Sequence, residues 1–188
     1  MARLSVETTQ RVAGAMVALA AGDALGAGYE FRRPPAHPEF IGGGLGGWDP
    51  GEWTDDTQMA ICVAEVAATG KPDPVAVGDR FLGWLHDGPA DVGVQTRAVL
   101  SGAKSGSDLT ELAKEYFESH PQNAAGNGSL MRTAPVALAG IGDDKVIADT
   151  ALSISSLTHG DPLAGEALCA VVHCHRPSRS RWPPRRHP

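Results

Sequence analysis

Apolar residues recur at spacings of three and four along almost the whole chain, and this periodicity restricts the fold to packed helices. Val12, Met16 and Leu19 form one such face. No segment shows the strict apolar–polar alternation of a half-buried strand. Two Asp-Pro pairs, at 73–74 and 161–162, match an N-cap residue followed by proline in the first helical turn. The sequence therefore predicts an all-α fold, a compact helical bundle.

The ends of the expected helices are set by local signals. Gly22 is typical of a residue that ends a helix, and Asp108 followed by Glu111 resembles a capping box. The glycine-rich segment 42–47 is expected to be a flexible loop. We expect helices over residues 12–21, 57–69, 74–85, 94–100, 109–117, 144–154 and 163–172.

The last 14 residues differ sharply in composition from the rest of the chain. Residues 175–188 hold five of the 16 Lys and Arg, none of the 22 Asp and Glu, and four prolines that forbid a helix. We expect one helical domain over 1–174 and a Pro/Arg-rich disordered tail over 175–188. A tail that directs the protein to RNA or a membrane is the weaker alternative. Because the last expected helix has no stop signal, we expect a bundle that is incomplete through truncation or a frameshift.

Composition also limits the partners and the compartment. The net charge is −6, and the positive charge in the tail leaves an acidic body, which makes nucleic acid an improbable partner. No run approaches the roughly 18 apolar residues that span a bilayer, so no membrane association is expected. The three cysteines show no metal-binding spacing and no disulfide framework, and no signal peptide is evident. We expect a cytoplasmic protein.

Thr54, Asp55 and Asp56 follow Trp53 where a loop enters an apolar, Ala-rich helix. Hydroxyl and carboxylate oxygens crowded at one point suit a hard divalent cation such as Mg²⁺ or Mn²⁺. The alternative is that Asp56 or Thr57 only caps the helix, since acidic residues are common at helix starts. The residues of this segment alone leave both interpretations open.

Three further blocks accompany this one in a fixed order. They are G-D-A-L-G with a later glutamate (22–31), G-N-G-S-L-M-R (126–132) and T-H-G-D-P (158–162). Together with W-T-D-D-T (53–57), they resemble the ADP-ribosylglycohydrolase family over about residues 10–170. The resemblance implies an orthogonal helical bundle. It also implies hydrolysis of a glycosidic bond at the anomeric carbon of ADP-ribose, with release of a protein side chain or a small acceptor.

The resemblance also implies roles for individual residues. Glu30 corresponds to a loop glutamate that performs acid/base work or positions water, and Asp55 and Asp56 belong to the catalytic centre. Thr54, Asp55 and Asp56 correspond to ligands of Mg²⁺ or Mn²⁺, with two ions in a complete family member. The residues implied in substrate binding are Asn127, Gly128, Ser129, Met131 and His159. The partner would be an ADP-ribosylated protein or an ADP-ribose derivative, with the acceptor linkage left open.

Each of these residues has a simpler interpretation. Glu30 and His159 could be ordinary loop residues, and Asn127-Gly128-Ser129 could be a turn instead of a phosphate-binding helix start. Asp23 is expected to be structural. The family's later D-x-D-T block has no counterpart in this chain. Two hypotheses follow: a metal-dependent hydrolase, or a catalytically inactive ADP-ribose-binding or remnant protein.

Overall fold

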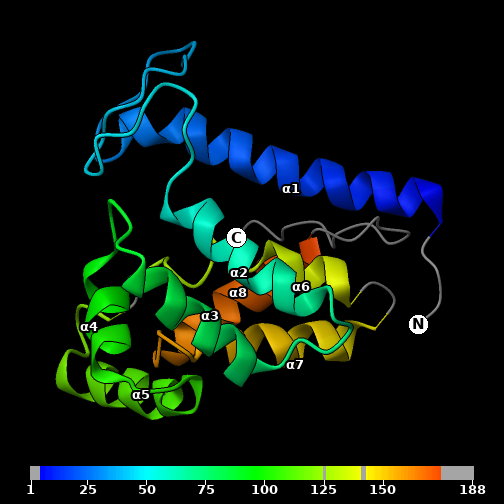
Figure 1. Cartoon of the computed structure of the whole chain (residues 1–188), viewed down its shortest axis with the longest axis vertical. Helices are drawn as coiled ribbons and strands as arrows, with labels where there is room; N and C mark the ends of the chain where they lie inside the picture. The colour runs from blue at the N-terminus through cyan, green and yellow to red at the C-terminus, as the bar shows by residue number, and fades with distance from the viewer. Residues whose placement is uncertain (1–4, 125, 141–142, 175–188) are drawn as a thin grey trace, which may run out of the picture.

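The computed structural model describes residues 5–124, 126–140 and 143–174. Within these ranges the chain forms α-helices and two short 3₁₀ helices, and its one β-bridge joins Gly43 to Trp48 (Figure 1). The all-α prediction is confirmed. The α-helices are α1 (Val6–Gly26), α2 (Asp55–Ala67), α3 (Pro74–His86), α4 (Val94–Gly102), α5 (Leu109–Ser119), α6 (Ala134–Ala139), α7 (Asp144–Ser155) and α8 (Pro162–Cys174); the 3₁₀ helices are η1 (Ala27–Tyr29) and η2 (Gly106–Asp108).

The hydrophobic core is formed by buried residues of α2, α3, α4, α5, α6, α7 and α8. Met59 and Val63 of α2, Phe81 of α3, Ile154 of α7 and Leu168 of α8 are fully buried in it. Met59 and Val63 lie four residues apart, so α2 contributes one apolar face to the core. The core thus fixes the start of α2 and the segment between α7 and α8 relative to each other.

Helix α1 lies along one side of this core (Figure 1) and contacts α2 and α6. Most of it is exposed: Val6 and Val17 keep 76% and 68% of their surface. An 18-residue window within the segment Val6–Tyr29 has a mean hydropathy of 1.3, and by length and composition alone this helix could cross a membrane. Core helices and N-terminal signal sequences share these properties. The finding corrects the expectation that no segment approaches such a composition.

Some helix boundaries match the sequence prediction and others do not. Asp73 accepts a hydrogen bond from the Val75 amide at 3.0 Å and Asp161 from the Leu163 amide at 2.9 Å, so both Asp-Pro starts are confirmed. Gly22 does not end α1, which continues to Gly26. The capping box expected at Asp108 and Glu111 was also wrong, because Asp108 instead completes a box with Ser105 at the start of η2.

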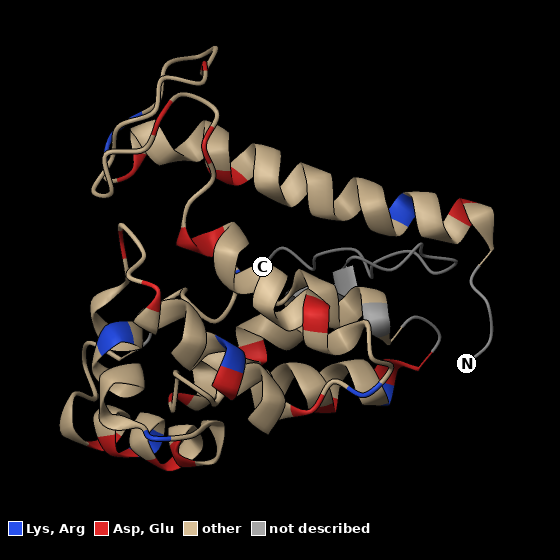
Figure 2. Ribbon diagram, in the orientation of Figure 1, with Lys and Arg blue, Asp and Glu red and all other residues tan. Residues whose placement is uncertain are grey.

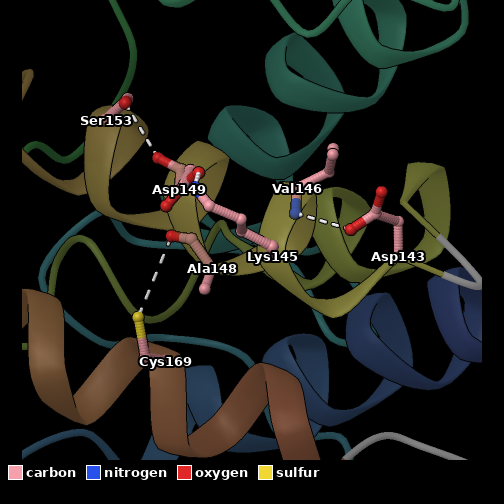
Figure 3. A network of polar contacts seen from close by, with 7 residues as sticks. All are labelled: Asp143, Lys145, Val146, Ala148, Asp149, Ser153 and Cys169. Atoms are coloured by element: carbon pink, nitrogen blue, oxygen red, sulfur yellow. Dashed lines mark hydrogen bonds and ion pairs between the residues drawn. The ribbon is translucent and has the colours of Figure 1, made fainter.

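Helices α7 and α8 pack side by side (Figure 3). Asp143 caps α7 by accepting from the Val146 amide at 3.1 Å, and Lys145 pairs with Asp149. The Cys169 thiol of α8 lies 3.9 Å from the Ala148 carbonyl oxygen. The packing of these two helices positions the segment between them, which carries T-H-G-D-P. The disordered tail predicted for 175–188 lies outside the described residues.

Candidate active site

A cavity of about 940 Å³ opens where the end of α1, the start of α2, the loop before α4 and the 126–131 segment meet. It brings all three remaining sequence blocks to the W-T-D-D-T block. Among the described residues that line it, five are acidic and none is Lys or Arg. The polar lining residues are Asp23, Tyr29, Glu30, Thr54, Asp55, Asp56, Asp91, Gln95, Thr96, Asn123, Asn127 and His159.

Asp23 of α1 connects the first block to the start of α2. Its carboxylate accepts from the Thr54 amide at 2.9 Å and the Thr54 hydroxyl at 2.7 Å. It also accepts from the Thr57 amide at 3.0 Å and the Thr57 hydroxyl at 2.6 Å. One side chain therefore satisfies two amides that a helix start leaves without partners. Asp23 therefore has the structural role that was expected. It lies in α1, but the helix that it caps is α2.

Replacing Asp23 by alanine is expected to lower the free energy of unfolding by about 3 kcal/mol, because charge-assisted hydrogen bonds are lost from partly buried groups. Asp73→Ala is the matched control. It removes the cap of α3, which accepts from one backbone amide, and should cost about 1 kcal/mol. Urea denaturation of both variants measures the difference. Equal losses would show that Asp23 is no more than a local cap.

Thr54 is the N-cap of α2, and Asp55 and Asp56 are its first two helical residues. The interpretation in which Asp56 or Thr57 caps this helix was therefore wrong. The Thr54 hydroxyl donates to Asp23. The Asp56 amide nitrogen lies 3.4 Å from the oxygen of the same Thr54 hydroxyl. The two carboxylates thus line the cavity without serving as caps.

Both carboxylates have raised pKa values. Burial, and next the negative charge of Asp91, raises the pKa of Asp55 to about 6. Burial, followed by the charges of Asp23, Asp55 and Glu30, raises the pKa of Asp56 to about 7. Desolvation and crowding of like charges are the two causes that disfavour ionisation of an acid. A bound cation would reverse the second cause.

Asp91 is a site residue that sequence reasoning missed. It precedes α4 in a loop, lines the cavity, and contributes the largest charge effect on the pKa values of both Asp55 and Glu30. Figure 2 shows acidic residues at the start of α2 and in the neighbouring loops. A lone Asp between alanine and valine carries no local motif. Only the folded chain brings it to the other carboxylates.

Glu30 follows η1 at the rim of the cavity. Burial, and next the charges of Asp91 and Asp23, raises the pKa of its carboxyl group. Its backbone is placed by a close approach between Gly28 and the loop: a methyl group on Gly28 would lie 2.4 Å from the Gly42 carbonyl oxygen. Gly42 itself has φ of 61°, which favours glycine. These two glycines hold the loop against the end of α1.

The site fits a divalent cation only in part. The crowded, partly desolvated oxygens of Thr54, Asp55 and Asp56 are suitable donors for Mg²⁺ or Mn²⁺. Within the ranges that the structure describes, however, no group of three or more His, Cys, Asp or Glu side chains is arranged to hold a metal ion. The described residues therefore supply one side of a coordination shell.

The G-N-G-S-L-M-R block forms a turn, and α6 begins only at Ala134, so the helix start predicted at 127–129 was wrong. The amides of Leu130 and Met131 donate to the Asn127 carbonyl at 2.8 and 3.3 Å. Asn127, Gly128 and Met131 line the cavity. Ser129 is 1% exposed and is not among the lining residues; its carbonyl accepts from the Thr133 hydroxyl.

His159 lines the same cavity as the acidic residues of α2 and is 3% exposed. Burial, and next the charge of Arg132, lowers its pKa to about 3, so the imidazole is neutral at pH 7. Gln95 of α4 also lines the cavity. Its amide nitrogen donates to the Thr158 carbonyl at 2.9 Å, and among the described residues its Oε1 has no partner.

Arg132 is the largest fully buried side chain of the described residues, and none of their ion pairs involves it. Its guanidinium lies 4.6 Å from the ring centroid of Phe81, a cation–π contact. Burial lowers its pKa to about 9, which leaves it cationic at pH 7. It donates to the carbonyl of Gly128 at 3.0 Å and the hydroxyl of Thr158 at 2.6 Å. Arg132 thereby joins the last two sequence blocks without facing a ligand.

Residues 4–176 match the sequence profile of the ADP-ribosylglycohydrolase family. The chain belongs to this family. The structure agrees: a solved structure described as an ADP-ribosylglycohydrolase-related protein complex superposes with a TM-score of 0.64 at 34% identity, over 89% of this chain and 55% of the other. The fold expected from the four sequence blocks is thus confirmed.

Curated relatives include the ADP-ribosyl-[dinitrogen reductase] glycohydrolase of Rhodospirillum rubrum, 33% identical over 86% of this chain and 55% of its own length. The ADP-ribosylarginine hydrolase Tri1 of Serratia proteamaculans (strain 568) is 34% identical over 70% of this chain and 37% of its own. The chain therefore spans about half the length, or less, of these relatives.

Proposed function

We propose that this chain binds ADP-ribose and takes part in its hydrolytic release from a modified protein side chain. One observation carries the proposal: the cavity joins the acidic start of α2 to the Asn127–Gly128 turn and His159. These two walls differ in chemistry. The acidic wall suits the reacting ribose and its acceptor, and the wall of backbone and imidazole suits the nucleotide.

The chemistry at the acidic wall follows from the pKa values. Departure of the acceptor leaves an oxocarbenium-like ribose, which nearby carboxylates stabilise. Glu30, whose pKa is raised by burial and by the charges of Asp91 and Asp23, lines the cavity where it can exchange a proton with water or the leaving group. Asp55 and Asp56 lie beside it at the same wall.

Thr54, Asp55 and Asp56 are the residues that we propose as ligands of Mg²⁺ or Mn²⁺. Such a cation, when bound, supplies positive charge that orients ribose hydroxyls and acidifies water. The observation that supports this proposal is the absence of Lys and Arg among the described lining residues, because five carboxylates then lack a balancing charge. Two ions would need ligands beyond the residues that the structure describes.

The acidic wall also favours a cationic acceptor, and we propose arginine over serine. A guanidinium is planar, always charged, and pairs well with carboxylates. Asp91 and Glu30 also line the cavity, and their negative charges act on the carboxyl group of Asp55 at the start of α2. Two relatives are named for ADP-ribosylarginine or for an ADP-ribosylated protein, which is consistent with this choice.

A second candidate is an ADP-ribose-binding protein without turnover. It is favoured by the incomplete coordination shell within the described residues. Under this candidate the cavity would bind ADP-ribose with little response to cations. Cytoplasmic location and the absence of membrane or nucleic-acid partners remain predictions from the sequence.

Calorimetric titration with ADP-ribose, with and without Mg²⁺ or Mn²⁺, tests binding, and release of ADP-ribose from arginine-linked and serine-linked substrates tests turnover. We expect binding that is strengthened by the cation and release from the arginine linkage. Binding without release supports the second candidate. Absence of ADP-ribose binding under all conditions rejects both.

A further inference from the structure

Three residues form a directed chain of hydrogen bonds that ends at the imidazole of His159. Arg132 Nη2 lies 2.6 Å from Thr158 Oγ1, and Thr158 Oγ1 lies 2.8 Å from His159 Nδ1. All three side chains are almost fully buried. Water therefore has little access to this chain of bonds, and the direction of each bond has to be consistent with the next.

The direction is set by the guanidinium. Arginine has donors and no acceptor, so Thr158 Oγ1 accepts from it. The threonine hydroxyl then has its own proton to donate, and His159 Nδ1 is the acceptor within reach. An imidazole that accepts at Nδ1 carries its proton on Nε2 when neutral. Its pKa of about 3 keeps it neutral.

The opposite direction, with Nδ1–H donating to Thr158, is disfavoured by charge. That arrangement would place a proton on the ring nitrogen that faces the buried Arg132 cation. The lone pair of Nδ1 is attracted by that cation instead. Thr158 is also held from a second side, because Gln95 donates to its carbonyl at 2.9 Å.

Nε2 of His159 faces the cavity wall formed by the G-N-G-S block. A methyl group on Gly128 would lie 3.0 Å from Cε1 and 3.3 Å from Nε2, and one on Gly126 would lie 3.5 Å from Nε2. Gly126, Gly128 and His159 all line the cavity. The Nε2–H group is thus presented at the surface that we assign to the nucleotide.

We propose that Arg132 and Thr158 are positioning residues that hold His159 as the Nε2–H tautomer, so that its imidazole donates a hydrogen bond to an oxygen atom of the bound nucleotide. The identity of the nucleotide rests on the proposed function. The direction of the hydrogen bonds does not, because it follows from the ligand-free protein. In this site His159 is a donor and not a proton acceptor.

Nitrogen NMR of the ligand-free protein labelled at the histidine rings tests the tautomer, with His159→Gln identifying the resonances. We expect a protonated Nε2 and an unprotonated Nδ1. In Thr158→Val the hydroxyl is lost, and a population with the proton on Nδ1 should appear. Thr158→Ser keeps the hydroxyl and should restore the wild-type signature. A wild-type Nδ1–H signature, or an unchanged Thr158→Val spectrum, overturns the proposal.

Binding tests the consequence of this arrangement. Thr158→Val should weaken ADP-ribose binding about tenfold, and Thr158→Ser should leave it near the wild-type value.

Titration with adenosine as well as ADP-ribose shows which part of the ligand supplies the oxygen atom that accepts from His159. A loss for both ligands places it on adenosine, and a loss for ADP-ribose alone places it elsewhere on the ligand. Unchanged affinity in Thr158→Val for both ligands overturns the role of the donor. Absence of ADP-ribose binding by the wild type, with the expected NMR signature, rejects the proposed function and leaves the tautomer assignment standing.

Discussion

Replacing Asp55 and Asp56 together by asparagine is expected to abolish the cation-dependent part of ADP-ribose binding. Loss of two charged ligands should weaken Mg²⁺ or Mn²⁺ binding by at least about a hundredfold, since even changes outside the ligand shell cost about 10–100-fold. The same variant should melt a few degrees higher than the wild type without cation. Both raised pKa values show that these carboxylates are unfavourably placed when ionised.

Asp143→Asn/Asp144→Asn is the matched control for this variant. It also removes two adjacent charges at a helix start, in α7, away from the cavity. Asparagine can still cap this helix, so little change in stability is expected. Calorimetric titration with each cation and thermal melting measure both effects. Unchanged cation binding in Asp55→Asn/Asp56→Asn would reject these ligands, and a lower melting temperature would reject the stated cost of their charges.

Local signals determined how well the helices were predicted. The Asp-Pro pairs at 73–74 and 161–162 are complete within a few residues, and both gave correct helix starts. Gly22 was misjudged because α1 continues past it, which lets Asp23 reach Thr54 of α2 at 2.7 Å. That contact joins residues 31 positions apart. A tertiary hydrogen bond therefore outweighed the tendency of glycine to end a helix.

The candidate site was predictable where residues form an ordered block and not where they stand alone. Asp55 and Asp56 are found from W-T-D-D-T, and the cavity contains both. Asp91 and Gln95 have no such context, and their place at the cavity follows from the packing of α4. Arg132 was visible in its block, but its complete burial was not, because lone arginines are usually exposed.

The apparent affinity for Mg²⁺ or Mn²⁺ is expected to fall steeply as the pH decreases below 7. Asp56 has a pKa of about 7 and Asp55 of about 6, and a cation binds only their ionised forms. Below pH 6 each bound cation displaces up to two protons, so the affinity should fall by up to about a hundredfold per pH unit. Above about pH 8 it should be constant. Calorimetric titrations between pH 5 and 9, in buffers of different ionisation enthalpy, measure the affinity and the protons released.

The same two groups make the cation-free fold respond to pH in the opposite direction. Their folded pKa values lie above the ordinary 3.8, so the folded chain binds more protons than the unfolded chain between about pH 4 and 7. Their contribution to stability therefore increases as the pH falls through 7 and is lost as the pH rises. Asp91→Asn removes the largest charge effect on the pKa of Asp55. The contribution of Asp55 to the pH profile of cation affinity and to that of stability should therefore move to lower pH. A cation affinity that stays constant from pH 8 to 5.5 would show that neither carboxylate titrates in this range. The control variant is Glu118→Gln, at an exposed position of α5, and it should leave both pH profiles unchanged.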